Sequence, residues 1–325
     1  MDSEFDLIAR IRVRAGTRAD VLLGIGDDAA ILRVPAGHDL VVSTDTLNSG
    51  VHFPPDTAPS DIGWKALAVN LSDLAAMGAE PAWCTLNLTL PTADGDWLDA
   101  FLDGFLELAA KHRVALVGGD TTRGPLAITV TAHGFMPHGA ALLRSGAQAG
   151  DDVWVSGTLG DAAAALRQWR DSQPVHPWLR ARLDRPTPRV ELGLALRGIA
   201  SACIDVSDGL LADLGHVAIA SGVGVEVDVA TLPASPALTA ACDEASRVAL
   251  QLRGGDDYEL CFTAPPPRTT DVLVAARHAD VIVKRIGRIE AQPGLRLREA
   301  DGTVHAVAPH GYRHFDPLCD EMDRA

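Results

Sequence analysis

A helical pattern of hydrophobic positions covers residues Asp61–Pro81. Apolar side chains fall at helical spacing on two faces of this segment, so we expect a helix that is buried on both faces. Ser60 or Asp61 is expected to cap its start. Gly78 followed by Pro81 is expected to end it.

One carboxylate on this predicted helix lies on an otherwise apolar face. Asp73 shares that face with a single other polar side chain, Asn70. An ionised Asp in an apolar environment is costly unless a partner compensates for the lost water. Two interpretations are open, a hydrogen-bonded or salt-bridged core residue and a metal ligand, and the other acidic segments must decide between them.

The segment 21–34 has a strand-like run followed by small residues that match the dinucleotide-binding pattern G-x-G-x-x-A: Gly24, Gly26 and Ala29. Asp27 and Asp28 at that turn would repel a pyrophosphate, and Pro35 interrupts the chain before a crossover helix can form. We therefore predict two strands joined by a turn, where the acids face a ligand or simply close the turn.

Acidic residues recur at other predicted strand ends, where glycines or small polar residues follow a hydrophobic run: Ser43-Thr44-Asp45-Thr46, Gly119-Asp120, Asp205 with Asp208, and Asp256 with Asp257. Carboxylate and hydroxyl oxygens side by side are typical ligands of hard cations such as Mg²⁺. Each turn alone is weak evidence, and an ordinary polar turn explains any one of them. Acids that recur without basic neighbours predict bound divalent cations if the turns converge.

A small, polar, glycine-rich segment from Pro137 to Asp152 is the best candidate for a domain boundary. We expect domains at residues 1–138 and 139–325. Arg144 lies in this linker, where it is either a solvated loop residue or a clamp for phosphate. His52 taken alone is more often a structural residue than a functional one. The Pro- and Arg-rich segment 171–189 is predicted to be irregular.

Composition limits the classes of partner. The 325 residues carry a net charge of −15, which argues against nucleic-acid backbones and anionic membranes as ligands. The five scattered cysteines form no C-x-x-C pair and indicate neither a disulfide framework nor a zinc site, as expected in a reducing cytoplasm. No run of about 18 apolar residues occurs, so no membrane-spanning helix is expected.

Several enzyme signatures are missing, among them the G-x-x-x-x-G-K-[ST] phosphate loop, the protein-kinase motifs, the G-x-S-x-G elbow and zinc helix motifs. The chain does contain GIGDDAA, STDTLNSGVHF, KALAVNLSDLAAMGAEPAW, GGDTTRG, LLRSGAQAGD, SGTLGDAAAAL, DVSDGL and GGDDYELCF, in this order. Together, from about Phe5 to Phe315, these motifs closely resemble the thiamine-monophosphate kinase family. The long motif around Asp73 best separates that family from aminoimidazole-ribonucleotide synthetase, selenophosphate synthetase and the hydrogenase-maturation dehydratase.

The resemblance implies an α+β fold with two domains of mixed β-sheet and flanking helices, aminoimidazole-ribonucleotide synthetase-like, and a homodimer formed through N-terminal strands. It implies ATP-dependent phosphorylation of thiamine monophosphate to thiamine diphosphate, assisted by several Mg²⁺ ions and without a general base. The implied Mg²⁺ ligands are Asp28, Ser43, Thr44, Asp45, Asp73, Asp120, Asp205 and Asp208. The implied ATP contacts are Gly119, Asp120, Arg144 and Ser207, and the implied contacts to thiamine phosphate are His52, Asp256 and Tyr312. Asp256 stands where the family usually has Glu.

Two other functions stay open at this point. One is another ATP-dependent synthetase of the same superfamily, although selenophosphate synthesis would require a reactive Cys near the N-terminus and the first Cys here is Cys84 in a predicted strand. The other is a non-catalytic acidic protein that binds divalent cations or nucleotide, which predicts binding without turnover.

Overall fold

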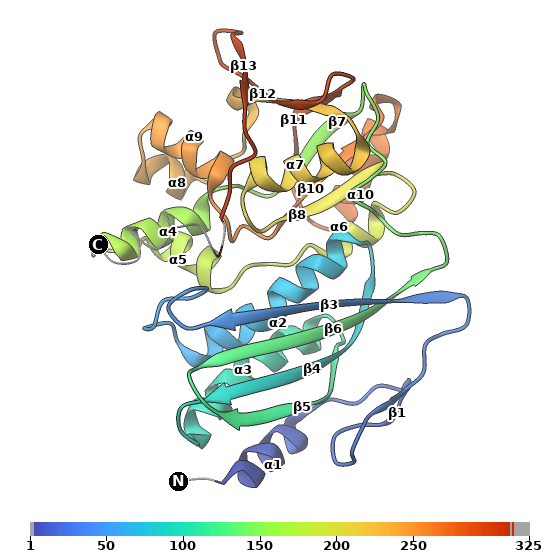
Figure 1. Cartoon of the computed structure of the whole chain (residues 1–325), viewed down its shortest axis with the longest axis vertical. Coiled ribbons are helices and arrows are strands. Elements are labelled where there is room, and N and C mark those ends of the chain that lie inside the picture. The colour runs from blue at the N-terminus through green and yellow to red at the C-terminus, as the bar shows by residue number, and fades with distance from the viewer. Residues whose placement is uncertain (1–2, 313, 315–325) are drawn as a thin grey trace. The chain divides into compact units, whose positions relative to one another are not determined.

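The computed structural model describes residues 3–312 and 314, which form two compact units. The first unit comprises Met1–Ala141 and Asp184–Arg197, and the second comprises Leu142–Leu183 and Gly198–Ala325. Each unit contains its own mixed sheet and helices, as the α+β expectation requires (Figure 1).

The first unit is built on a four-stranded sheet of order β3-β6-β4-β5, in which only the β4/β5 pair is parallel. Its elements are α1 (Glu4–Arg14), β1 (Val21–Leu23), β2 (Ile31–Leu32), β3 (His38–Asn48), α2 (Pro59–Ala76), β4 (Glu80–Leu90), α3 (Gly95–Lys111), β5 (Ala115–Arg123), β6 (Ala127–Pro137) and α6 (Val190–Ala195). Helix α3 is the crossover that a parallel pair requires. The antiparallel pair β1/β2 confirms two short strands in place of a dinucleotide-binding turn.

Helices α2 and α3 pack side by side on one face of this sheet (Figure 1). Two glycines permit the close crossing, because a Cβ at Gly63 would lie 2.0 Å from the Phe101 carbonyl oxygen and one at Gly104 would lie 1.7 Å from that of Ser60. Helix α6 returns to α2 in the same way, since a Cβ at Gly193 would lie 2.0 Å from the Ala75 carbonyl oxygen. Backbone therefore contacts backbone at both helix crossings.

The second unit is built on a seven-stranded sheet of order β13-β12-β9-β11-β7-β10-β8, in which β12/β9 is the parallel pair. Its elements are β7 (Asp152–Ser156), α4 (Asp161–Arg170), α5 (Pro177–Asp184), β8 (Ala202–Val206), α7 (Leu210–Ser221), β9 (Gly224–Asp228), η1 (Val229–Thr231), α8 (Pro236–Ala241), α9 (Glu244–Arg253), β10 (Glu259–Ala264), η2 (Pro266–Arg268), α10 (Thr269–His278), β11 (Val283–Glu290), β12 (Gly294–Arg298) and β13 (Val304–Val307). Leucines of α7 and aliphatic residues of the sheet form one buried core.

Four local expectations are corrected. Helix α2 is capped at Ala58, without a side-chain hydrogen bond, because Pro59 occupies its first turn and leaves Ser60 and Asp61 inside the helix. The Ser43–Thr46 cluster lies within β3 and not at its end. Asp120 lies within β5, since the turn follows at Gly124. The segment 171–189 is not irregular throughout, because it contains α5.

Candidate functional site

A cavity of about 550 Å³ in the first unit gathers one group of the predicted residues. Asp27 and Asp28 enter it from the β1–β2 loop, and Gly119 and Asp120 enter it from β5. Apolar side chains of α1 complete the wall. Since Asp28 and Asp120 are both exposed at this cavity, their oxygens can reach a ligand.

Gly119 allows strands β4 and β5 to approach closely beside Asp120. Its φ is +146°, and a Cβ there would lie 1.9 Å from the Leu86 carbonyl oxygen of the neighbouring strand β4. No other residue fits such a close approach of two strands without moving the backbone. The glycine therefore fixes the strand pairing beside Asp120, which lies opposite Asn87.

A second group in the first unit connects β3 with α2. The Ser43 hydroxyl donates a hydrogen bond to Oδ2 of Asp73, which is half-buried near the end of α2. Strand alternation places Asp45 on the same face as Ser43. Thr44 points to the opposite face, where its hydroxyl contacts Thr131 Oγ1 at 3.0 Å, so only its carbonyl can join a ligand set with Asp45.

The ring of His52 is oriented by the main chain. The Asn48 amide donates to Nδ1 of His52 at 3.0 Å, so in the neutral ring Nε2 carries the proton and is a donor. Lys65 of α2, which is 1% exposed, donates from Nζ to the His52 carbonyl oxygen at 2.9 Å. The imidazole and the backbone of His52 are thus both held from inside the unit.

In the second unit, the predicted nucleotide and metal residues lie at the carboxyl end of β8. Asp205 is 4% exposed, and Ser207 and Asp208 are half-buried in the turn before α7. Burial raises the pKa of Asp208, whereas the charges of His314, His216 and Arg144 lower it less. Arg144 is an exposed residue of this second unit, close enough to act on the Asp208 carboxyl.

The predicted substrate residues of this unit bind to the same turn through their backbones. The amide of Asp256 donates to the Ser207 carbonyl oxygen at 2.8 Å, and that of Tyr312 donates to the Asp208 carbonyl oxygen at 2.9 Å. Tyr312 is 38% exposed, and its ring packs edge-on against that of His314, with centroids 4.9 Å apart. The turn therefore brings Asp256 and Tyr312 beside Ser207 and Asp208.

The paired acids Asp256 and Asp257 have different environments. Asp257 is 1% exposed, and its carboxylate accepts the Gly160 amide at 2.8 Å, so it is a structural residue. Burial raises its pKa well above the usual range. Asp256 is half-buried, has a φ of +68° and accepts the Tyr258 hydroxyl at 3.0 Å. A left-handed conformation at a non-glycine residue is typical of functional sites.

Sequence reasoning missed three residues that hold these groups in place. They are Lys65, Tyr258 and Asp213, whose Oδ2 accepts the amides of Ser207, Asp208 and Gly209. Burial raises the pKa of Asp213 to about 8, and the neighbouring charges of Asp205 and Asp208 add to this effect. For Lys65 the available signal was a polar residue among apolar helix positions, the same signal that drew attention to Asp73, whereas Tyr258, which precedes β10, carried no such signal.

The donor atoms fit Mg²⁺ by their chemistry, because they are carboxylate and hydroxyl oxygens. Among the described residues of each unit, no three His, Cys, Asp or Glu side chains come together closely enough to hold a metal ion by themselves. Mg²⁺ in phosphoryl-transfer sites usually takes one or two carboxylates and completes its shell with substrate phosphates and water. Asp28 and Asp120 line one cavity, and Asp205 and Asp208 lie at the end of β8 and in the turn that follows it, so each pair offers two carboxylates in one region of the unit.

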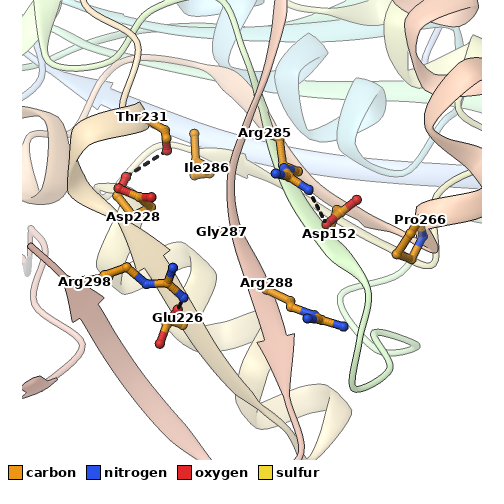
Figure 2. Close-up of a pocket in the computed structure, with 10 residues that line it drawn as sticks. All are labelled: Asp152, Glu226, Asp228, Thr231, Pro266, Arg285, Ile286, Gly287, Arg288 and Arg298. Carbon is orange, nitrogen blue, oxygen red and sulfur yellow. Dashed lines mark hydrogen bonds and ion pairs between the residues drawn. The ribbon is translucent and has the colours of Figure 1, made fainter. Parts of the chain in front are cut away.

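A second cavity, of about 370 Å³, lies on the seven-stranded sheet and has a different character (Figure 2). Arg285 Nη1 lies 3.3 Å from Asp152 Oδ1, and Arg298 pairs with Glu226. Figure 2 shows both pairs across the strands that line the cavity. Because Asp152 and Glu226 are each paired with an arginine, these two carboxylates are less available to a cation than those of the acidic turns.

Comparison with known proteins agrees with this architecture. Residues 26–136 match the N-terminal domain of AIR synthase related protein, and residues 148–299 match its C-terminal domain. A thiamine-monophosphate kinase of Salmonella typhimurium is 49% identical over 321 residues, which cover 96% of this chain and 98% of that protein. The Escherichia coli K12 protein of the same name is 48% identical over 320 residues, again with 96% and 98% coverage.

Solved structures extend the similarity to three dimensions. Thiamine-monophosphate kinase from Stenotrophomonas maltophilia K279a is 56% identical, with a TM-score of 0.86 over 92% of this chain and 97% of that one. AaThiL complexed with AMPPCP and TMP is 33% identical, with a TM-score of 0.77 over 96% of both chains. The fold is therefore that of the AIR synthase related proteins. Within that class, the chain belongs to the thiamine-monophosphate kinase family, as its motifs predicted.

Proposed function

We propose that this chain transfers the γ-phosphoryl group of ATP to thiamine monophosphate, the last step of thiamine diphosphate biosynthesis. The observation that carries the proposal is the turn Ser207–Asp208, which holds predicted nucleotide residues and binds the predicted substrate residues Asp256 and Tyr312 through its two carbonyls. The relative AaThiL was solved in complex with AMPPCP, which is an ATP analogue, and with TMP, which abbreviates thiamine monophosphate. That complex supports the same pair of ligands for this chain.

In the proposed reaction, an oxygen of the thiamine phosphate forms a bond to the γ-phosphorus of ATP. The bond from that phosphorus to the β,γ-bridging oxygen breaks, and ADP leaves. The accepting oxygen is already an anion near neutral pH, so we assign no general base. This is a phosphotransferase reaction with a phosphate group as acceptor.

Charge neutralisation is the main task of such a site, because the two substrates bring together about six negative charges. Several Mg²⁺ ions bound by Asp28, Ser43, Thr44, Asp45, Asp73, Asp120, Asp205 and Asp208 would neutralise and align the phosphate oxygens. Gly119, Asp120, Arg144 and Ser207 would bind ATP. The Nε2–H of His52 can donate to the acceptor phosphate, while Asp256 and Tyr312 would bind the thiamine part.

We propose that residues 1–138 bind ATP and Mg²⁺ and form a homodimer, and that residues 139–325 complete the active site. The exposed face of β3 supports the dimer, since Leu40 and Val42 are 46% and 54% exposed there. Leu40 and Val42 are two positions apart on the edge strand β3, so they share one face, and an apolar patch on such a face is a surface that another subunit can cover. Sedimentation equilibrium tests this surface, and Val42→Lys should shift the dimer towards monomer.

We also propose a cytoplasmic location. No helix in the described part of the chain is long and apolar enough to span a membrane. The four cysteines with described structure are free thiols, which suits a reducing compartment. Selenophosphate synthesis is disfavoured, because Cys84 is fully buried and burial raises the pKa of its thiol far above neutrality.

The test is to incubate the protein with ATP, MgCl₂ and thiamine monophosphate and to measure thiamine diphosphate and ADP by chromatography. We expect equal amounts of both products, formed only when all three components are present. Binding of both ligands without thiamine diphosphate would identify a non-catalytic nucleotide-binding protein. ADP formation that does not depend on thiamine monophosphate would indicate another member of the superfamily.

A further inference from the structure

The turn between β8 and α7 is held by a single buried carboxylate oxygen. Oδ2 of Asp213 accepts the main-chain amides of Ser207, Asp208 and Gly209, each at 3.1 Å. Asp213 belongs to the first turn of α7 and is 3% exposed. Its side chain therefore reaches back from the helix to the preceding loop and provides an acceptor for amides that the helix itself leaves without one.

The carbonyl groups of the same turn point to two other segments. Ser207 accepts the amide of Asp256 at 2.8 Å, and Asp208 accepts that of Tyr312 at 2.9 Å. Each of these turn residues is thus fixed at its amide by Asp213 and at its carbonyl by a predicted substrate residue. A displacement of the turn must move Asp256 and Tyr312 as well or break their hydrogen bonds.

Glycines let the segments that contain Asp256 and Tyr312 approach the turn so closely that no side chain fits between them and the turn. A Cβ at Gly255 would lie 2.5 Å from the Ser207 carbonyl oxygen, and one at Gly311 would lie 2.4 Å from that of Asp208. These glycines directly precede Asp256 and Tyr312 in the chain. The backbone contacts therefore leave little room for the turn to shift alone.

We propose that Asp213 is a positioning residue that couples nucleotide binding at Ser207 and Asp208 to thiamine-phosphate binding at Asp256 and Tyr312. The roles of these four residues rest on the proposed function, whereas the hydrogen bonds that join them do not. Asp213 itself touches neither substrate in this proposal. It acts by fixing the one turn that both substrate sites share.

The experiment compares Asp213→Ala with Asp213→Asn. Calorimetry measures the affinity for AMPPCP and for thiamine monophosphate, each alone and with the other present, in buffer containing MgCl₂. Asp213→Ala should weaken both ligands at least fivefold and reduce the effect of one ligand on the affinity for the other. Asp213→Asn keeps an acceptor oxygen and should recover part of both affinities, because the amides of the turn keep a hydrogen-bond partner.

Hydrogen exchange gives a readout that does not depend on function. In Asp213→Ala, the amides of Asp256 and Tyr312 should exchange at least tenfold faster than in the wild type, because their acceptor carbonyls are no longer fixed. The matched control is Asp151→Asn, a buried carboxylate in the same unit that accepts the Gln148 amide at 3.0 Å and the Ser201 hydroxyl at 2.6 Å. The control should lower stability and leave both affinities and both exchange rates near those of the wild type.

Three outcomes would overturn the coupling. They are a folded Asp213→Ala protein whose two affinities stay within twofold of wild type, unchanged exchange at Asp256 and Tyr312, and equal loss of affinity in the Asp151→Asn control. If Asp213→Ala does not fold, the same criteria apply to Asp213→Asn. If the wild type binds AMPPCP but makes no thiamine diphosphate, the proposed function fails, and hydrogen exchange with AMPPCP bound still decides whether Asp213 transmits nucleotide binding to Asp256 and Tyr312.

Discussion

Replacing Lys65 by Met should impair the binding of thiamine monophosphate more than that of ATP. The Lys65 ammonium is buried and donates to the His52 carbonyl oxygen at 2.9 Å. Met fills a similar volume without the donor, so the change removes the hydrogen bond and leaves little cavity. A hydrogen bond from a charged donor contributes about 1.5–3 kcal/mol. If that energy holds His52 in its binding position, its loss corresponds to a KM for thiamine monophosphate about tenfold to a hundredfold higher.

Steady-state kinetics decide this prediction, with thiamine monophosphate varied at saturating ATP and then ATP varied at saturating thiamine monophosphate. Urea unfolding of the same variant measures the accompanying loss of stability. Lys284→Met, at an exposed position of β11, controls for the loss of one positive charge. A folded Lys65→Met enzyme with a KM for thiamine monophosphate within threefold of wild type would refute the reasoning, and so would an equal rise in both KM values.

Further predictions concern the remaining groups of the site and one buried histidine. Asp73→Asn should abolish turnover at limiting Mg²⁺ while the fold persists, and a Mg²⁺ titration of activity that matches the wild type would make Asp73 a structural acid. Arg144→Ala should raise the Kd for AMPPCP at least tenfold and leave that for thiamine monophosphate unchanged, which calorimetry can check. Tyr312→Ala and Asp256→Ala should each raise the KM for thiamine monophosphate about tenfold, or about 1.4 kcal/mol, with the KM for ATP nearly constant; an effect on ATP alone would remove both from the substrate site. Burial, aided by the Lys111 charge, lowers the pKa of His112 to about 4. Between pH 6.5 and 4 the unfolded chain therefore binds more protons at this residue than the folded chain does, and stability should fall as the pH falls through that window. His112→Phe should remove about 2 kcal/mol of the stability difference between pH 7 and pH 5 in urea unfolding, and an unchanged difference would contradict the assignment.

Elements whose signals are local could be predicted from the sequence. The continuous apolar pattern predicted α2, and Gly78 after its end was correctly identified as its stop, with a φ of +65°. Asp27 and Asp28 correctly indicated that the G-x-G-x-x-A segment is not a dinucleotide-binding turn. The structure has the short antiparallel pair β1/β2 at this place.

The features that could not be predicted from the sequence depend on contacts between segments that are distant in the chain. A polar run such as Ser43–Thr46 resembles a strand end, and only pairing with β6 keeps it inside β3. Asp213 resembles an ordinary residue of a helix start until its amide partners in the preceding turn are known. Tyr258 is not recognisable as a partner of Asp256, because the contact depends on left-handed backbone at both residues.

The return of residues Asp184–Arg197 to the first unit has a consequence for synthesis of the chain. Helix α6 packs backbone to backbone on α2 through Gly193, and Arg197 Nε donates to the Gly78 carbonyl oxygen at 2.5 Å. The first unit therefore cannot be completed when residue 141 leaves the ribosome, and it must wait for the segment up to residue 197. At about 5–20 residues per second, this delay lasts roughly 3 to 11 seconds, during which the apolar surface of α2 that α6 later covers is open to chaperones and to other nascent chains.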